Sequence, residues 1–149
     1  MELESEVKGH FRNEYHKGLI NLIYTVNLLS YEFLQSLKNH GVTEQQYNVL
    51  RILRGFRSQA PVSLGFIKER MLDRNSDVSR IVDKLQRRGL VSRDVSSCDR
   101  RQKAIQITDK GLNLLSSMLD CEKKVDLLLN NLTPDELRQL NQLLDKIRG

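Results

Sequence analysis

Cysteine is scarce in this sequence, and long apolar runs are absent from it. The two cysteines, Cys98 and Cys121, are too few for a disulfide framework, and neither lies in a Cys-x-x-Cys pair or beside a histidine cluster. No apolar run approaches the roughly 18 residues that a membrane-spanning helix needs. The first six residues include three glutamates and no basic residue, unlike a signal peptide. We therefore expect no structural metal, no membrane association and a cytoplasmic location.

The motifs of the common enzyme classes are missing too. There is no glycine-rich phosphate loop, no His-Glu zinc motif and no nucleophile elbow. His10, His16 and His40 lack the paired spacing that brings histidines to a metal, so we expect them at the surface or in packing contacts. We predict no enzymatic activity, no catalytic residue and no cofactor.

Positive charge is present in only one part of the chain. The 149 residues, the size of a single domain, carry a net charge of +5. Residues 51–110 contribute +8, whereas residues 1–50 contribute −2 and residues 111–149 contribute −1. Such an asymmetry is expected when one face of a protein meets a polyanion. A basic but merely solvated surface would give the same count, so charge alone does not decide.

Helical periodicity dominates the first half of the chain. Apolar residues recur every three or four positions in four segments, each preceded or closed by a residue typical of a helix end. The segments are 11–37 closed by Gly41, 43–55 with a capping box at Thr43–Gln46, 63–71 capped by Ser63, and 76–89 capped by Asn75 or Ser76. We expect four helices there.

After the fourth helix the period changes to that of strands. Residues 90–95 and 104–108 are short and rich in β-branched side chains, which predicts an antiparallel pair. Residues 96–103 between them are too polar for a core and too long for a tight turn, so they should form a projecting hairpin tip. Helical periodicity returns over 108–132, and Thr133–Glu136 starts a last helix. The predicted fold class is mainly α with a small two-stranded antiparallel hairpin.

The second, third and fourth predicted helices and the hairpin, in this order, form a winged helix-turn-helix. In this fold the last of the three helices, here residues 76–89, can enter the major groove of DNA. On the polar side of the fourth helix, Arg80 and Arg87 can reach guanine or phosphate. Ser76 and Ser79 are short enough to let the helix start approach a phosphate. Asp83 can orient an arginine or accept a hydrogen bond from cytosine. An ordinary amphipathic surface helix would show the same periodicity, but the hairpin after it favours DNA binding.

The hairpin tip is the second predicted DNA contact. It carries Asp99, Arg100, Arg101 and Lys103. An exposed arginine gains from the negative potential of a narrow minor groove, and Asp99 would hold one guanidinium in place. A polar loop with a weak ion pair is the plain alternative, and the position one strand after the helix argues against it.

Four segments together resemble the MarR family of bacterial transcriptional regulators. They are Ser76–Leu85, Arg88–Arg93, Asp99–Arg101 and Ile107–Gly111. The resemblance covers about residues 43–111, and it implies a homodimer on an inverted repeat of double-stranded DNA, with the fourth helix in the major groove and Arg101, oriented by Asp99, in the minor groove. Asp77 replaces the small or hydroxyl residue common in the family, so its role as a DNA contact or as a partner of the helix dipole stays open.

The resemblance also implies that a chemical signal regulates DNA binding. Family members respond to a small aromatic or phenolic effector bound where the end helices meet the winged lobe, or to oxidation of a cysteine. The first long helix lacks the cysteine of the peroxide-sensing members. Cys98 lies beside the tip arginines, which would favour its thiolate, so it is either a redox site whose oxidation weakens DNA binding or an incidental exposed thiol. Cys121 is expected to be buried packing.

The length of the end helices argues for a dimer independently. A first helix of about 27 residues spans roughly 40 Å, too far for a lobe of about 70 residues to cover. Two subunits that interlock their ends can bury these stripes around a two-fold axis. We assign residues 1–42 to an N-terminal dimerisation helix, 43–111 to the winged helix-turn-helix lobe and 112–149 to C-terminal dimerisation helices, within one structural domain.

The predicted function is a sequence-specific DNA-binding transcriptional regulator, a repressor that an effector releases or tunes. The alternative is a winged helix that binds a protein or RNA, which predicts little preference for duplex DNA.

Overall fold

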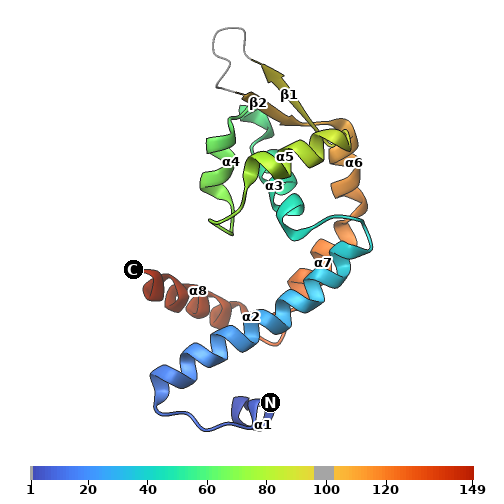
Figure 1. Ribbon diagram of the computed structural model, residues 1–149. Coiled ribbons are helices and arrows are strands. Elements are labelled where there is room, and N and C mark those ends of the chain that lie inside the picture. The colour runs from blue at the N-terminus through green and yellow to red at the C-terminus, as the bar shows by residue number, and fades with distance from the viewer. Residues whose placement is uncertain (1, 96–102) are drawn as a thin grey trace.

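A lobe of short helices and a hairpin lies on an arm built from the two ends of the chain (Figure 1). This computed structural model describes residues 2–95 and 103–149. The arm contains α1 (Leu3–Val7), α2 (Glu14–Lys38), α7 (Leu119–Leu127) and α8 (Pro134–Arg148). The lobe contains α3 (Glu44–Gly55), the short 3-10 helix η1 (Arg57–Gln59), α4 (Leu64–Arg70), α5 (Val78–Arg87), β1 (Val91–Val95), β2 (Lys103–Ile107) and α6 (Asp109–Ser117). The predicted fold class is confirmed.

Side-chain caps begin four helices where the sequence predicted them. Capping boxes start α3 at Thr43 and α8 at Thr133, and the hydroxyls of Ser63 and Thr108 cap α4 and α6. Each cap satisfies a backbone N–H that has no partner inside its helix. These polar residues therefore fix where the apolar stripes begin.

The first long helix starts later than predicted and has a short helix before it. The Asn13 side chain accepts a hydrogen bond of 2.9 Å from the backbone N–H of His16, so α2 begins at Glu14 rather than at Phe11. The five residues of α1 are too few for a periodic signal, which is why the sequence did not reveal it. Leu3 is buried and anchors α1.

The predicted helix over residues 108–132 is two helices. It breaks at Met118, a fully buried residue that ends α6 and precedes α7. The break redirects the chain from the lobe to the arm, where α7 lies beside α2 (Figure 1). Continuous apolar spacing across the break hid it from sequence analysis.

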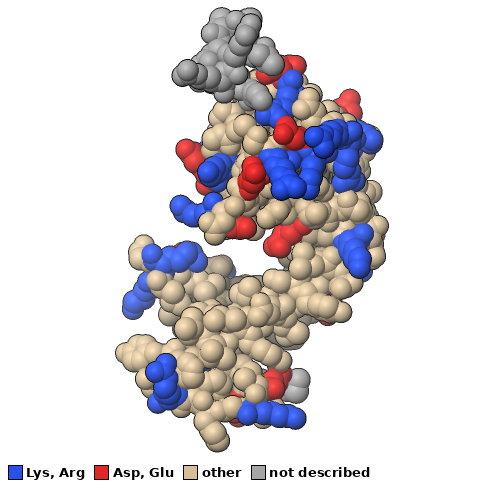
Figure 2. Space-filling model, viewed as in Figure 1, with Lys and Arg blue, Asp and Glu red and all other residues tan. Residues whose placement is uncertain are grey.

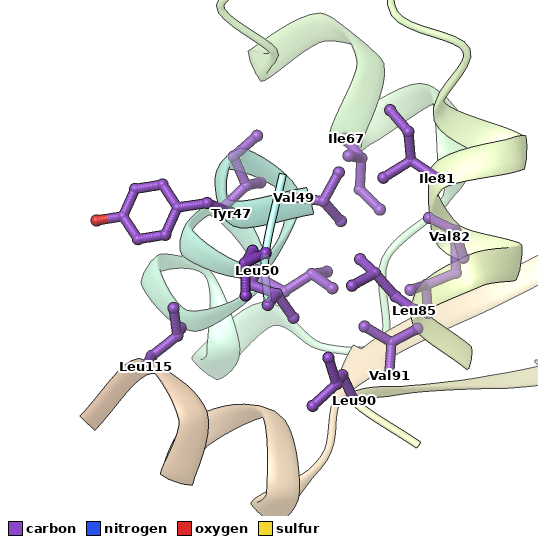
Figure 3. Packing of buried hydrophobic residues seen from close by; sticks show 14 of the residues in the cluster. Tyr47, Val49, Leu50, Ile67, Ile81, Val82, Leu85, Leu90, Val91 and Leu115 are labelled. Atoms are coloured by element: carbon purple, nitrogen blue, oxygen red, sulfur yellow. The ribbon is translucent and has the colours of Figure 1, made fainter. Parts of the chain in front are cut away.

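The core of the lobe fills the space between α3, α4 and α5 (Figure 3). The buried side of α5 is the predicted one, with Val78, Ile81, Val82 and Leu85 all turned inward. Full burial of one such side chain contributes about 1.5–3 kcal/mol. The opposite side of α5 is therefore held toward solvent.

The hairpin has one more anchor than the sequence indicated. β1 and β2 are antiparallel, with Val91 opposite Ile107. Val62, in the loop before α4, exchanges backbone hydrogen bonds of 2.9 and 2.7 Å with Ile105. A single paired residue gives no periodic signal. This bridge ties the centre of β2 to the lobe.

Gly111 allows α6 to approach the strands closely. A Cβ at this position would lie 2.3 Å from the carbonyl oxygen of Leu90 and 2.7 Å from Cγ1 of Ile107. Just before it, the Thr108 hydroxyl donates to the carbonyl oxygen of Gly89 (2.6 Å). The segment from Ile107 to Gly111 thus joins the end of α5 to α6.

None of the helices formed by residues 2–95 and 103–149 is long and apolar enough to cross a membrane.

Candidate nucleic-acid interface

The exposed side of α5 carries a row of cations. Arg80, Lys84 and Arg87 are exposed, and their spacing of four and three residues places them on one face of the helix. We call these three residues the cationic stripe. Figure 2 shows that Lys and Arg side chains gather on the face of the lobe that α5 crosses. The helix has 10 residues and is about 15 Å long, and the diameter of an α-helix, about 10–12 Å with side chains, matches the width of the DNA major groove.

Most residues of this exposed face were predicted from the sequence as DNA contacts. Ser79, Arg80 and Arg87 are exposed as expected. Lys84 was missed, although it follows Arg80 by one turn. The spacing of the three cations was the signal that could have identified it.

Ser76 does not lie on the exposed face. Its side chain is buried, and its hydroxyl has no hydrogen-bond partner among the described residues. The expected placement is wrong because Ser76 precedes the first turn of α5, where helical spacing no longer applies. Its backbone N–H donates to the carbonyl oxygen of Asp73 (3.2 Å) and closes the turn between α4 and α5.

Asp77, rather than Asn75 or Ser76, caps α5. Its Oδ1 accepts a hydrogen bond of 3.2 Å from the backbone N–H of Arg80. A carboxylate at a helix start is also favoured by the helix dipole. The interpretation of Asp77 as a partner of the dipole therefore has a geometric basis, and its side chain is exposed.

Asp83 forms an ion pair with Arg93, in the middle of β1. The side chain of Arg93 is only 8% exposed, whereas that of Asp83 is 47% exposed. Asp83 thus orients an arginine, as one of its two predicted roles required, but this arginine belongs to the hairpin and was not predicted from the sequence as the partner of Asp83. Because Asp83 lies beside the cationic stripe, the ion pair links the exposed side of α5 to the hairpin.

The predicted contacts at the hairpin tip lie mostly outside the described residues. This holds for Asp99, Arg100 and Arg101, and for the redox candidate Cys98. Lys103 is described only by its backbone position in β2, opposite Val95. These residues stay predictions.

Other cations of the basic segment have structural roles. Nη1 of Arg88 donates to the carbonyl oxygen of Gly41 (2.8 Å) and to Oε1 of Gln46 (3.3 Å). Nζ of Lys110 donates to the carbonyl oxygen of Arg88 (2.8 Å). These three hydrogen bonds tie segments of the chain together, so only part of the +8 charge is available to a ligand.

A cavity of about 510 Å³ lies between the arm and the lobe. Its arm wall is mainly apolar, with Phe33 of α2 and Leu128 just after α7. Its lobe wall includes the polar side chains of Asn48 and Arg51 from α3. Leu72, in the turn between α4 and α5, also lines it and is 73% exposed. The cavity can accept a small molecule with an apolar body and a polar head.

A hydrogen-bond cluster crosses from the lobe to the arm at this cavity. Oε1 of Glu122 in α7 accepts from the Tyr47 hydroxyl (3.1 Å) and from Nη2 of Arg54 (2.8 Å), both in α3. Burial, and secondarily the Glu122 carboxylate, raise the pKa of Tyr47 to about 12. Tyr47 therefore stays a neutral donor at physiological pH.

The arm leaves much apolar surface uncovered in a single chain. Leu19, Ile23 and Val26 of α2 are each at least half exposed, and no residue of α8 is buried. A groove of about 610 Å³ between α2 and α8 is lined by leucines from both helices and by Ile147.

Cys121 is buried, as predicted, with its Sγ 3.9 Å from the carbonyl oxygen of Ser36. In the ranges that the structure describes, no three His, Cys, Asp or Glu side chains are grouped to hold a metal ion.

Comparison with known proteins finds a match to the MarR family over residues 40–102. The HTH-type transcriptional regulator YkoM of Bacillus subtilis, itself uncharacterized, is 30% identical over 114 residues, which are 76% of this chain and 72% of that protein. The S. aureus MepR–DNA complex superposes with a TM-score of 0.76 at 22% identity, covering 93% of this chain and 97% of that one. Bordetella bronchiseptica BpsR, whose DNA binding is regulated by 6-hydroxynicotinic acid, gives 0.76 at 21% identity, with 89% and 99% covered.

Proposed function

Since this chain belongs to the MarR family of transcriptional regulators, we propose that it is a sequence-specific repressor that binds a palindromic operator as a homodimer. The observation that carries the proposal is the cationic stripe of Arg80, Lys84 and Arg87 on a helix whose other side is fixed in the core. Such a helix can enter a major groove and place its cations against phosphates and guanine edges. The likeness to the MepR–DNA complex supports the same use of the fold.

The uncovered arm supports the homodimer. α2 has 25 residues and is about 38 Å long, yet only Leu37 of it is buried in the single chain. A second copy can cover the stripes of α2 and α8, because a two-fold axis brings identical apolar surfaces together. The same axis would place two α5 helices about 34 Å apart, one turn of DNA, so that they read the two halves of an inverted repeat.

The cavity between arm and lobe supports control by a small aromatic or phenolic effector. A ring can pack on Phe33 and Leu128 while a carboxylate or phenolate meets Asn48 and Arg51. The regulation of BpsR by 6-hydroxynicotinic acid supports this class of ligand. Bound in the cavity, the effector would separate arm and lobe and change the spacing of the two α5 helices.

Leu72 connects the cavity to the turn before α5, so a ligand in the cavity can change the position of α5 through it. The turn that follows it is closed by Asp73, whose Oδ1 accepts from the backbone N–H of Asn75 (2.9 Å) and whose carbonyl accepts from that of Ser76. A ligand that displaces Leu72 therefore moves this turn, and Asp77 at the start of α5 moves with it. This displacement would lower the affinity for DNA.

The proposal is tested by binding of the full chain to duplexes selected from random sequence, with an A-form RNA duplex of matched length as the control. We expect a strong preference for a subset of DNA duplexes and a steep fall in affinity with salt, because the contacts release counterions from phosphates. Equal binding to RNA and DNA, or to all DNA sequences, would instead favour the RNA-binding or protein-binding module.

A further inference from the structure

Asp83 is an acidic residue on a surface proposed to meet phosphates. It lies on the exposed half of α5, beside Arg80, Lys84 and Arg87. Judged by charge alone, a carboxylate at this position opposes DNA binding. Its presence therefore calls for a role that outweighs this repulsion.

The geometry around Asp83 indicates such a role. Its partner Arg93 lies at the centre of β1, directly opposite Ile105 of β2. Ile105 is in turn fixed to the lobe through its two backbone hydrogen bonds with Val62. The guanidinium of Arg93 is almost fully buried, so this cation is not available to a phosphate and instead neutralises Asp83.

We infer that Asp83 and Arg93 form a clamp that fixes the hairpin to α5, so that helix and hairpin meet DNA as one rigid unit and Asp83 reads no base. The inference rests on the proposed DNA-binding function. In this view Asp83 is a positioning residue, because it acts through Arg93 and β1 rather than by touching DNA. A preorganised pair of contacts loses less entropy on binding than two independently moving ones.

The direction in which one substitution changes the affinity for DNA tests the clamp. Asp83→Asn removes a negative charge near DNA, so simple electrostatics predicts tighter binding. The clamp predicts weaker binding, by about tenfold, the scale of losing one groove contact. Asp94→Asn is the matched control, since Asp94 is exposed in the same hairpin and has no ion pair with a described residue. It should leave the affinity unchanged or raise it, and an Asp83→Asn protein that binds as tightly as wild type or tighter would overturn the inference.

A second measurement separates the clamp from base reading. With a panel of operators that differ by single base pairs, a clamp variant loses affinity on all of them to a similar degree. A base reader loses discrimination at one position only. In a double-mutant cycle with Arg101→Ala, the clamp also predicts that the two losses do not add, because Asp83 acts through the hairpin. Loss of discrimination at one base pair together with additive losses would assign Asp83 to readout instead.

Hydrogen exchange of the free protein keeps the inference testable without DNA. In Asp83→Asn, backbone amides of β1 and β2 should exchange faster, while those of α3 remain protected. Arg93→Lys, which keeps the charge but loses the planar fork, should show a smaller change in the same direction. If wild type binds no duplex, the proposed function fails while faster exchange still supports the clamp. Unchanged exchange in both variants would reject the clamp whatever the protein binds.

Discussion

Arg54 in α3 donates a hydrogen bond of 2.8 Å to Glu122 in α7, and this ion pair joins the lobe to the arm. Tyr47 shares the same carboxylate oxygen, so one acidic side chain of the arm holds two side chains of a single lobe helix. The contact borders the proposed effector cavity. Any ligand that enters there therefore acts on the joint between the two parts of the molecule.

The first prediction concerns the titration of Tyr47. Because its pKa in the folded protein is about 12 and its ordinary value is 10.0, the folded chain keeps a proton that the unfolded chain loses between these pH values. Stability should therefore fall as pH rises from 10 to 12, and this contribution is fully present below pH 10. The side chain of Glu6 also raises the pKa of Tyr24, so the titration is followed in a Tyr24→Phe background. Tyrosinate absorbance of that protein should show one late step, which should disappear when Tyr47→Phe is added. A late step that survives in that variant would contradict the assignment.

The second prediction concerns Gly111. Gly111→Ala places a methyl group against the Leu90 carbonyl and should lower the free energy of unfolding by about 1–3 kcal/mol or more. Gly65→Ala in α4 is the matched control, because its Cβ would make only an ordinary contact of 3.8 Å with Ser63. It should be neutral or stabilising by up to about 1 kcal/mol. Equal midpoints for both variants in urea denaturation would refute the close approach.

The third prediction concerns the cationic stripe. Lys84→Ala should weaken binding to all duplexes and reduce the slope of log affinity against log salt by about one, the effect of one lost phosphate contact. Lys123→Ala, an exposed lysine of α7 in the arm, is the charge-matched control. Fluorescence anisotropy across a salt series measures both slopes. The stripe is not the contact surface if the two variants behave alike.

The fourth prediction concerns Leu72. Leu72→Trp fills part of the cavity and should weaken DNA binding in the absence of any effector, since the larger side chain displaces the turn before α5. Leu72→Ala should keep DNA binding but respond less to added 6-hydroxynicotinic acid or benzoate, the probes for an aromatic acid. Anisotropy with and without each probe checks both variants. Unaltered affinity in Leu72→Trp would show that the turn does not transmit the state of the cavity.

The fifth prediction concerns the dimer. Ile147 is 67% exposed on α8 in the single chain and lines the groove with α2. Ile147→Asp should shift the sedimenting particle from about twice 17.3 kDa toward 17.3 kDa, because a buried unpaired charge is costly at an interface. Gln142→Asp, an exposed polar position of the same helix, should remain dimeric. A wild-type monomer at micromolar concentration would already exclude the homodimer.

The sequence predicted the order of the elements because caps and apolar spacing are local signals. Thr43, Ser63, Thr108 and Thr133 each begin a helix in the structure as expected. Met118 was missed because a buried residue can continue an apolar stripe while the helix axis changes direction. Such a break is set by what the next helix packs against, which the spacing alone does not encode.

The site was predicted less completely than the fold. Arg80 and Arg87 follow from helical spacing, but the partner of Asp83 does not, since Arg93 lies in a strand and meets Asp83 only through tertiary packing. Ser76 shows the converse error, because helical spacing was extended to a residue two positions before the helix begins at Val78. The cluster of Tyr47, Arg54 and Glu122 joins residues far apart in the chain, and no local sequence pattern predicts it.

Selection of duplexes from random DNA, followed by sequencing of those bound by the wild-type chain, tests the central claim most directly. Two copies that present their α5 helices across a two-fold axis should enrich an inverted repeat with half-site centres about 10–10.5 base pairs apart, or a multiple of that spacing. Enrichment of an isolated half-site, or of no sequence at all, would contradict the account.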